Sequence, residues 1–263
     1  MKYALVSGVR QEAESSLKGE CIGCGRPMIA RCGEVRIKHW AHQGRLRCDT
    51  WWEPETEWHR AWKNQFPSEW QEVVHFAQDG EKHIADVKTE QEWVLEFQHS
   101  NIKPEERQSR DNFYQKLIWV VDGKRRIRDK KQFFEALSQG RGRWIDSEKY
   151  PEIHPLFYPE GTLFRDWSTS TSHVFFDFGE DDLWWLLPQS NEEWALILQI
   201  SRRKFIELHL DTALTGVSSF DSLVKKYDLR PPERNRFDST SHATNIHPNY
   251  FLMRTKIKRR FRL

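Results

Sequence analysis

The chain has 263 residues, enough to bury a substantial core as one large domain or two modest ones. Its 41 Lys and Arg nearly balance its 39 Asp and Glu, so any surface that binds nucleic acid must be local rather than global. No run reaches the roughly 18 apolar residues of a membrane span, and the start MKYALVSGV is too short for a secretory signal, so we expect a cytoplasmic protein with no membrane partner.

Residues 2–9 predict a short strand, which leads through a polar stretch into a knuckle that contains all the cysteines. They lie within 28 residues, at Cys21, Cys24, Cys32 and Cys48. In a chain without an export signal, this clustering favours metal binding over disulfides.

Cys21 and Cys24 form a CxxC turn, and two further ligands would complete a tetrahedral zinc site. The candidates are His39, His42 and Cys48; we favour His42 and Cys48, with His39 as the alternative. The remaining cysteine reads as a free thiol. The predicted zinc ion is structural, because the compact knuckle leaves no evident open position. Reduced cysteines and core histidines are the alternative reading.

A helix is expected over residues 53–66, with Pro54 in its first turn. Trp58, Trp62 and Phe66 share one stripe at helical spacing, which is typical of packing against a sheet. Glu57 is off the middle of this stripe, and we expect it to point toward a metal site and hold or position a second ion.

After a strand at 71–77, the stretch 82–100 predicts a hairpin with its turn at residues 89–91, because β-branched and aromatic residues alternate with polar ones. A turn centred on Glu90 sets Asp86 opposite Val94 and diagonal to Glu96. Alternation places Asp86, Glu96 and Gln98 on one face. The opposite face carries the apolar residues Ala85, Val87, Trp93, Leu95 and Phe97.

Two carboxylates on neighbouring strands, with backbones about 7 Å apart, can converge on one small hard cation. Asp86 and Glu96 therefore predict the core of a metal-dependent nuclease site. The alternative is an acidic, solvated face of a half-buried hairpin. A helix opening at Pro104 and an apolar strand at 117–121 follow, which gives a compact α/β unit with a mixed sheet.

The segments HIADV, EFQHSNI, EERQSRDNFY and IWVVDG resemble, in this order, the nuclease domain of competence protein CoiA-like proteins, a branch of the PD-(D/E)XK nuclease superfamily. Upstream, CIGCG, HWAH, Cys48 and ETEWHRAWK are similar to the zinc-binding start and first helix of that family. The resemblance spans roughly residues 20 to 123, and several motifs in the right order are more specific than any one of them.

The resemblance implies that Asp86 and Glu96 are metal ligands and that Glu57 is the acidic residue of the first helix. Four further residues match family motifs, and we assign them to nucleic-acid binding: His59 and Lys63 of an HxxxK motif, and Arg110 and Tyr114 of an RxxxY motif.

Gln98 departs from the wider superfamily, where a lysine usually stands, although ExQ is the form of the CoiA-like branch. A lysine would neutralise charge in the transition state, whereas glutamine orients water only through neutral hydrogen bonds. Either the metal alone supplies the charge, or a cation from elsewhere does so, or catalysis is lost. The candidate cations are Lys63, Lys88 and Lys116.

We expect hydrolysis of a phosphodiester with one or two Mg²⁺ or Mn²⁺ ions, held by Asp86, Glu96 and the main-chain carbonyl of Phe97. In this mechanism Gln98 places the attacking water. His83 is a candidate phosphate contact, with a structural role as the alternative. Ser100 either contacts the phosphate backbone or caps the following helix.

Beyond residue 124 the chain has a basic strip to residue 131, a helix at 132–137 and a Gly- and Arg-rich turn at 140–143. The strip either follows a nucleic-acid backbone or is simply solvated. Three strands are expected at 173–178, 183–187 and 194–200, with helices at 201–210 and 212–228, a loop at 230–249 and a basic tail at 254–262. The tail clamps a phosphate backbone or is a solubilising end. This part lacks catalytic spacing, so we read it as support or as a surface for a protein partner.

The sequence thus predicts an α+β chain with a zinc-binding knuckle at 1–52, a PD-(D/E)XK-like nuclease core at 53–140, and a β-rich lobe with a basic tail at 141–263. The expected function is metal-dependent hydrolysis of DNA, in uptake and recombination or in defence against phage. One alternative is a zinc-containing nucleic-acid-binding factor with an inert nuclease-like site. A zinc hydrolase would need an open metal position, against which the closed knuckle argues.

Overall fold

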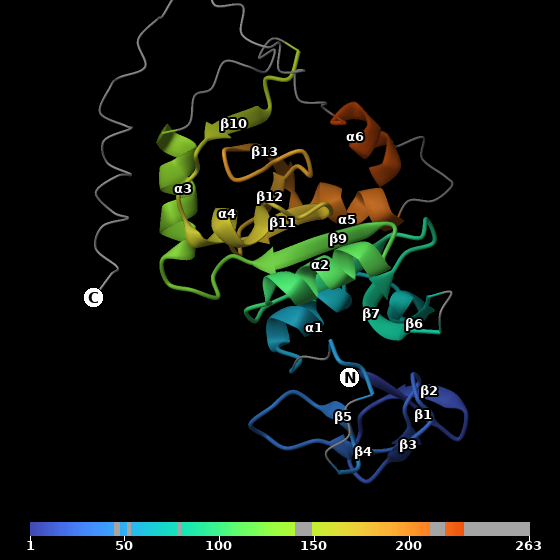
Figure 1. The fold of residues 1–263 in the computed structure, drawn as a ribbon. Helices are drawn as coiled ribbons and strands as arrows, with labels where there is room; N and C mark the ends of the chain where they lie inside the picture. Colours follow the sequence, from blue (N-terminus) through green and yellow to red (C-terminus); the bar gives the residue numbers. More distant parts are fainter. Residues whose placement is uncertain (45–47, 52–53, 78–79, 140–148, 211–218, 229–263) are drawn as a thin grey trace, which may run out of the picture. The chain divides into compact units, whose positions relative to one another are not determined.

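Two β-sheets organise the described chain (Figure 1). The computed structural model describes residues 1–44, 48–51, 54–77, 80–139, 149–210 and 219–228. Within these ranges the smaller sheet has the strand order β2-β1-β3-β4-β5, and the larger has the order β10-β13-β12-β11-β9-β8-β7-β6. No helix in the described ranges combines the length and apolar character that crossing a membrane requires.

The smaller sheet is antiparallel and forms the N-terminal module. Its strands are β1 (Tyr3–Val6), β2 (Val9–Glu12), β3 (Lys18–Glu20), β4 (Pro27–Arg31) and β5 (His39–His42). The single strand predicted over residues 2–9 is instead a hairpin, because Ser7 and Gly8 both have positive φ, at 51° and 80°, and close a two-residue turn. Its small core centres on Trp40, which is buried together with Met28.

The larger sheet begins after the helix α1 (Glu57–Lys63), which is shorter than the predicted helix over 53–66. Thr56 caps α1 by accepting a hydrogen bond from the main-chain N–H of His59, and this cap sets the start of the helix. A 3₁₀ turn (Ser68–Trp70) then leads into three antiparallel strands. They are β6 (Gln71–Phe76), β7 (Lys82–Lys88) and β8 (Val94–Gln98).

The helix α2 (Pro104–Phe113) connects β8 to β9 (Leu117–Asp122), which pairs with β8 in parallel. Pro104 stands at the start of α2, where its missing N–H costs nothing, and Glu105 and Glu106 follow in the first turn. Because β8 and β9 are parallel while β6, β7 and β8 are antiparallel, the mixed sheet and the α+β class predicted from the sequence are confirmed.

The second half of the chain continues the same sheet. Its elements are α3 (Asp129–Gln139), β10 (Ile153–Phe157), α4 (Thr162–Trp167), β11 (His173–Asp177), β12 (Asp182–Leu186), β13 (Trp194–Ser201), α5 (Arg202–Leu210) and α6 (Phe220–Lys226). β11 pairs in parallel with β9, from His173 opposite Ile118 to Asp177 opposite Asp122. The expected boundary at residue 140 therefore falls within one sheet.

Three sequence predictions lie outside the described residues: the turn at 140–143, the loop at 230–249 and the basic tail at 254–262. The first part of the predicted helix over 212–228 also lies outside them. β10 and α4 were not predicted. β10 is a sheet-edge strand interrupted by Pro155, which obscures the strand pattern in the sequence.

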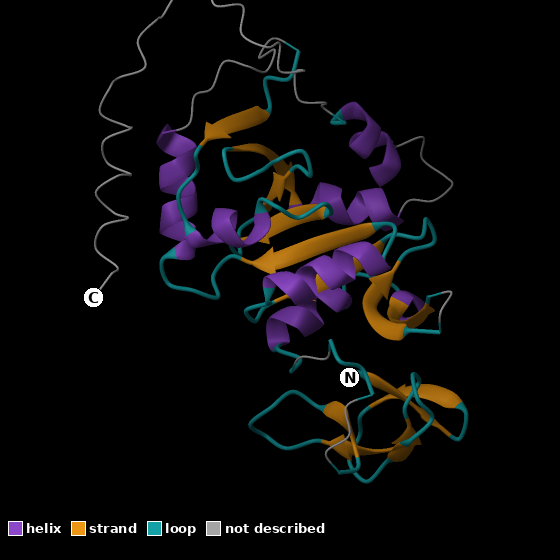
Figure 2. Cartoon of the chain, in the orientation of Figure 1, coloured by secondary structure: helices purple, strands orange, loops and turns teal. Residues whose placement is uncertain are grey.

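Helices pack on both faces of the larger sheet (Figure 2). One face buries Phe97, Val120 and Phe175 against residues of α1, α5 and α6. The other buries Trp119, Val121 and other residues against α3 and α4. Val120 points to one face of β9, and Trp119 and Val121 point to the other. Because both faces are covered, the sequence of β9 is a continuous apolar run.

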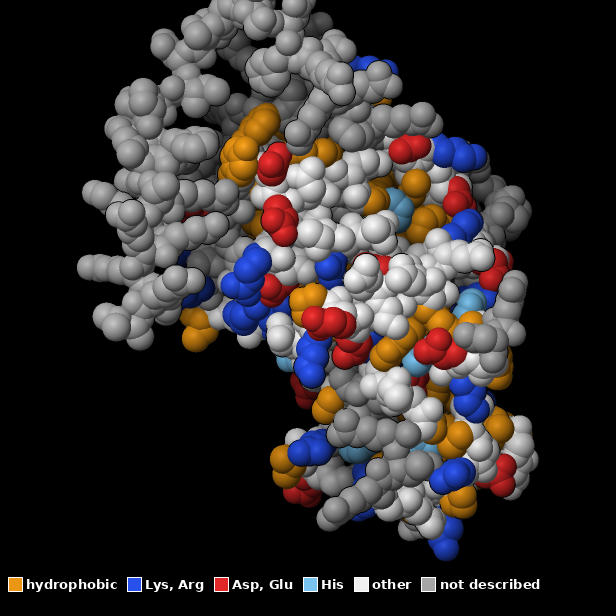
Figure 3. Space-filling model, in the orientation of Figure 1, with side chains coloured by type: hydrophobic (Ala, Val, Ile, Leu, Met, Phe, Trp, Pro, Cys, Tyr) orange, Lys and Arg blue, Asp and Glu red, His pale blue; other side chains and the backbone are white. Residues whose placement is uncertain are grey.

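Charged side chains are interspersed on the face drawn in Figure 3, as the balanced composition suggests. The predicted basic strip is largely paired with acidic neighbours. Arg126 lies 2.8 Å from Asp129, and Lys130 lies 2.5 Å from Glu180. Much of the strip's charge is therefore compensated within the chain.

Candidate functional site

β7 and β8 separate at Asp86, and we call this point the fork. β7 pairs with β8 at only two positions, where Val87 faces Leu95 and Lys88 faces Val94. The sequence set Asp86 opposite Val94, so the observed register is shifted by two residues, which keeps each side chain on its predicted face. Continued to Asp86, this register places Asp86 directly opposite Glu96 rather than diagonal to it. Ala85 differs from the prediction, because it packs in the cluster on the other face of the sheet from Phe97.

The Asp86 carboxylate occupies the gap that opens at the fork. Its Oδ2 accepts a hydrogen bond of 3.0 Å from the main-chain N–H of Phe97, in place of a main-chain partner on β7. Asp86 remains partly exposed, with 23% of its side chain accessible. It is therefore anchored to β8 and still accessible from solvent.

Glu96 is buried, and only one of its two carboxylate oxygens is satisfied. Oε2 accepts from Arg110 Nη1 at 3.2 Å, whereas Oε1 has no hydrogen-bond partner among the described residues. Burial, reinforced by the nearby Asp86 carboxylate, raises the pKa of Glu96 well above its ordinary value. A cation between Asp86 and Glu96 would supply the missing partner and favour the ionised form.

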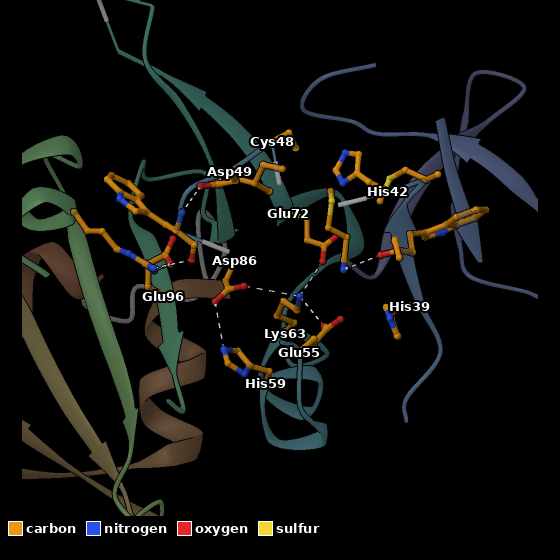
Figure 4. A pocket seen from close by; sticks show the side chains of 18 residues that line it. His39, His42, Cys48, Asp49, Glu55, His59, Lys63, Glu72, Asp86 and Glu96 are labelled. Atoms are coloured by element: carbon orange, nitrogen blue, oxygen red, sulfur yellow. Dashed lines mark hydrogen bonds and ion pairs between the residues drawn. The ribbon is translucent and has the colours of Figure 1, made fainter. Parts of the chain in front are cut away.

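Lys63 of α1 is the buried cation nearest to Asp86 (Figure 4). Its Nζ lies 2.7 Å from Glu55 Oε1, 2.9 Å from Glu72 Oε1 and 3.8 Å from Asp86 Oδ1. Burial alone would lower the pKa of Lys63, but Glu72 and Glu55 outweigh burial and raise that pKa, so Lys63 stays charged. His59 Nε2, one turn earlier on α1, lies 4.0 Å from Asp86 Oδ2.

A cavity of about 590 Å³ contains these groups and is lined by both the N-terminal module and the larger sheet. Its charged lining includes five carboxylates against two basic side chains: Asp49, Glu55, Glu72, Asp86 and Glu96, with Lys63 and Arg110. His39, His42 and His59 also line it. The N-terminal ammonium of Met1 also lines the cavity, yet the carboxylates still outnumber the cations, and an added cation would ionise Glu96 as well.

Sequence reasoning missed Glu55, Glu72 and Asp49. Glu55 stands in the same ETEWHRAWK segment as the predicted Glu57, two residues earlier. Glu57 itself is exposed and does not line the cavity, so the structure does not place it at a metal site. Glu72 has a positive φ of 47°, and its carboxylate accepts from the main-chain N–H groups of Lys2 and Tyr3, a long-range contact that no local pattern indicates.

Gln98 lies outside the cavity lining. Its side chain is buried, and its Nε2 donates to the main-chain oxygen of Ser100 at 3.1 Å. The structure therefore does not aim this amide at the fork, where the sequence assigned it to placing water. Ser100 is exposed.

The residues assigned to nucleic-acid binding divide into two groups. His59, Lys63 and Arg110 line the cavity, but Lys63 and Arg110 are bound to carboxylates of the site. His83 and Tyr114 are buried outside the lining. The rings of His83 and Trp51 are stacked, with their centroids 3.2 Å apart. Burial together with Glu96 raises the pKa of Tyr114. Both residues are therefore packed inside the protein and do not face the cavity.

The two other candidate cations have partners elsewhere. Lys88 pairs with Glu92 at 2.7 Å, and Lys116 pairs with Asp221 at 3.1 Å. Neither lines the cavity. Of the three lysines considered from the sequence, Lys63 alone reaches the site.

A second group of ligand atoms lies in the N-terminal module. The thiols of Cys21, Cys24 and Cys48 and a ring nitrogen of His42 lie within 4.8 Å of one another, and we call them the Cys₃His cluster. They are the four residues that the sequence interpretation favoured. Cys32 is a free thiol outside the cluster, and His39 Nδ1 instead donates to the main-chain oxygen of Ile37 at 2.9 Å.

The spacing of the Cys₃His cluster suits a tetrahedral ion. Zinc–sulfur bonds of about 2.3 Å at the tetrahedral angle put two sulfurs about 3.8 Å apart. The Cys21 and Cys48 sulfurs are 3.6 Å apart, and Cys24 Sγ lies 3.3 Å from His42 Nε2. Burial raises the pKa of the Cys48 thiol, an unfavourable state for a ligand that a bound cation would reverse.

Comparison with known proteins adds one family. Residues 82–170 match the model of the family described as "Competence protein CoiA, nuclease-like domain". No curated protein and no solved structure matches the chain. The matched residues start at β7 and so include the fork with Asp86 and Glu96. Over residues 82–170, from β7 onward, the chain is similar to the nuclease-like domain of the competence protein CoiA family.

Proposed function

We propose that the protein is a metal-dependent nuclease that hydrolyses phosphodiester bonds of DNA at the fork. The observation that carries this proposal is the meeting of Asp86 and Glu96 in one cavity, with Glu96 Oε1 buried and without a hydrogen-bond partner. A buried carboxylate oxygen in this state is costly unless a cation or a proton satisfies it. The match to a nuclease-like family points to nucleic acid as the substrate.

The donor set suits Mg²⁺ or Mn²⁺, because both ions prefer carboxylate and carbonyl oxygens. In our proposal Asp86 and Glu96 hold the ion, and the main-chain carbonyl of Phe97 completes the protein ligands. The bound ion would lower the pKa of a water molecule and polarise the phosphate. The chain's own contribution is a pair of carboxylates, each fixed by its own donor. The Phe97 N–H fixes Asp86, and Arg110 fixes Glu96.

Of the three lysines considered from the sequence, Lys63 is the one that reaches the site. Its charge lies 3.8 Å from Asp86 and is fixed by Glu55 and Glu72, which hold the ammonium in place. Because two carboxylates already neutralise it, Lys63 orients Asp86 more than it adds positive charge to the site. We assign His59, 4.0 Å from Asp86, to contact with the phosphate that enters the cavity.

We further propose that the Cys₃His cluster binds a structural zinc ion and that the protein acts on incoming or foreign DNA. All four ligand positions are filled by side chains, which is typical of structural rather than catalytic zinc. The family's description as a competence protein supports a setting in uptake and recombination, and defence against phage is the other setting that we propose.

One observation favours a second candidate, an inert nucleic-acid-binding factor. The Gln98 amide donates to Ser100 and lies outside the cavity lining, so the position of the usual catalytic lysine has no group directed at the site. In this case the fork would bind a cation without cleaving.

Cleavage of single- and double-stranded DNA and of RNA by the full chain, with Mg²⁺ and Mn²⁺ titrated, separates these functions. We expect Asp86→Asn and Glu96→Gln each to lower the rate by at least about two orders of magnitude. Glu92→Gln, at an exposed acid of the same hairpin, should leave the rate unchanged. Equal cutting by all four proteins would identify a contaminant, and DNA binding without cutting would establish the inert factor.

A further inference from the structure

The segment 48–51 joins the Cys₃His cluster to the strand that carries Asp86. Cys48 is a cluster member, and the next residue, Asp49, is buried. Asp49 Oδ2 accepts a hydrogen bond of 2.8 Å from the main-chain N–H of Ile84, two residues before Asp86. Ile84 pairs with Val74 of β6 on one side, whereas β8 has already left β7 on the other side, where Asp49 supplies the acceptor.

The same segment also reaches Glu96 on the other side of the fork. The main-chain oxygen of Trp51 accepts from Arg110 Nη2 at 2.7 Å, and Arg110 Nη1 donates to Glu96 Oε2 at 3.2 Å. Asp49 Oδ1 fixes the segment's own turn by accepting from Trp51 N–H at 2.9 Å. Residues 48–51 thus contact one carboxylate strand directly and the other carboxylate through Arg110.

The CxxC turn holds β7 from a second direction. Lys82 Nζ donates to the main-chain oxygen of Gly23 at 2.6 Å. A Cβ at Gly23 would lie 3.0 Å from the Ile84 side chain, so the turn packs closely on the same residue whose N–H binds Asp49. The CxxC turn and segment 48–51, which both carry cluster residues, therefore converge on Ile84.

We infer that the Cys₃His cluster, when it holds its metal, fixes the geometry of the fork, and that Asp49 is the positioning residue that transmits this effect to Asp86. Segment 48–51 belongs to no helix or strand, so its position depends on Cys48 as a metal ligand and on the contacts of Asp49 and Trp51. Besides the bond from Ile84, Asp49 Oδ1 bonds His83 Nδ1 at 2.8 Å, and the Trp51 ring stacks on the same histidine. Release of the metal frees Cys48, so that Asp49 is held against β7 by His83 and Trp51 alone and its hydrogen bond to the Ile84 N–H opens more often. The prediction for cation affinity rests on the function proposed above, whereas the ordering of β7 does not.

Two measurements on the full-length, zinc-loaded protein test this inference: Mn²⁺ affinity by electron paramagnetic resonance, and hydrogen exchange of peptides that contain Ile84. Asp49→Ala keeps all four cluster residues, so it should retain about one zinc per chain, yet expose the Ile84 amide and weaken Mn²⁺ binding by about tenfold or more. Asp49→Asn keeps one oxygen acceptor, which can serve Ile84 or Trp51 but not both, so it should restore the two properties only in part. Cys48→Ser should lose zinc and reproduce the Asp49→Ala result.

Cys32→Ser is the matched control, because Cys32 lies in the same module outside the cluster. It should behave as the wild type in both measurements. If Cys48→Ser unfolds the whole chain, exchange across β11 and β12 will reveal it, and Asp49→Ala alone decides. Unchanged exchange at Ile84 in Asp49→Ala overturns the inference. A wild type that binds no Mn²⁺ overturns the proposed nuclease instead, while the exchange result still judges the coupling.

Discussion

The Lys63 ammonium and the Asp86 carboxylate lie 3.8 Å apart where α1 meets β7, although the shorter contacts of Lys63 go to Glu55 and Glu72. These contacts link three elements: the segment before α1, α1 itself and β6. A lysine with only 3% of its side chain exposed needs such partners to remain charged.

Replacing Lys63 should be strongly destabilising. Lys63→Met leaves Glu72 buried without its lysine and leaves Glu55 with Arg60 alone, so we expect a loss of about 3 kcal/mol in the free energy of unfolding, measured by urea denaturation. Lys88→Met removes a lysine whose partner Glu92 is exposed, so it should cost less than about 1 kcal/mol. Equal losses in the two variants would show that the buried pair does not stabilise α1 against β6.

Removing the charge of Glu96 should stabilise the metal-free protein. Burial and Asp86 raise the pKa of Glu96 in the folded state above its value in the unfolded chain. The protonated side chain therefore stabilises the fold at low pH, and this stabilisation is lost as the pH rises above the pKa of the unfolded state. At pH 7, Glu96→Gln should therefore raise the free energy of unfolding by about 1 kcal/mol, and the gain should shrink toward acid pH.

Mn²⁺ should reverse that order, because the wild type alone binds it tightly. Thermal unfolding with and without Mn²⁺ measures both effects. Glu106→Gln serves as the control, since Glu106 pairs with the same Arg110 but is half-buried at the surface. A metal-free Glu96→Gln protein that is less stable than wild type would contradict the cost assigned to the buried carboxylate.

Two histidines inside the fold, the buried His209 and the partly buried His173, should make the fold sensitive to acid. Burial lowers the pKa of His173 and of His209 to about 4 in each case. The stabilisation of the fold by these neutral histidines is fully present above the pKa of histidine in the unfolded chain, about 6.5. It is lost as the pH falls toward 4, because the unfolded chain takes up protons first.

Each of these histidines accounts for up to about 3 kcal/mol across this interval. His209→Leu should flatten the dependence of unfolding free energy on pH between 6.5 and 4, whatever its effect at pH 7. His154→Gln, at an exposed histidine, should leave the slope as it is. An unchanged slope in His209→Leu would mean that His209 takes up a proton in the folded state.

Asp177 should anchor α1 to the second half of the sheet. Its Oδ2 accepts from the indole N–H groups of Trp58 and Trp62, each at 2.9 Å, and its Oδ1 pairs with Arg202. Asp177→Ala leaves these donors buried, so we expect a loss of about 3 kcal/mol or more and a shift in tryptophan fluorescence. Asp182→Ala, whose partner Gln199 is exposed, should change neither. Equal effects of the two changes would refute this anchoring role.

Local spacing was sufficient to predict much of the candidate site. The predicted register was wrong by two residues, but Asp86 and Glu96 still lie on one face, because side chains alternate with a period of two. The CxxC turn, His42 and Cys48 belong to one short stretch, in which metal-ligand spacing is visible in the sequence.

Contacts made over long separations could not be predicted in this way. Glu72 reaches Lys2 and Tyr3, and Asp49 reaches Ile84, through side-chain to main-chain hydrogen bonds that leave no periodic signal. The pairing of β11 with β9 likewise depends on a crossover through α3, β10 and α4, which strand propensity alone does not define.

The parallel pairing of β9 with β11 also limits how the chain can be shortened. All six residues of β9 are buried, and one of its two hydrogen-bonding edges is occupied by a strand more than fifty positions later. A truncated fragment ending after α3 would present that edge, apolar on both sides, to any other unpaired strand, and it should self-associate. The half of this molecule that carries the fork is thus obtainable in monomeric form only with the strands that follow it.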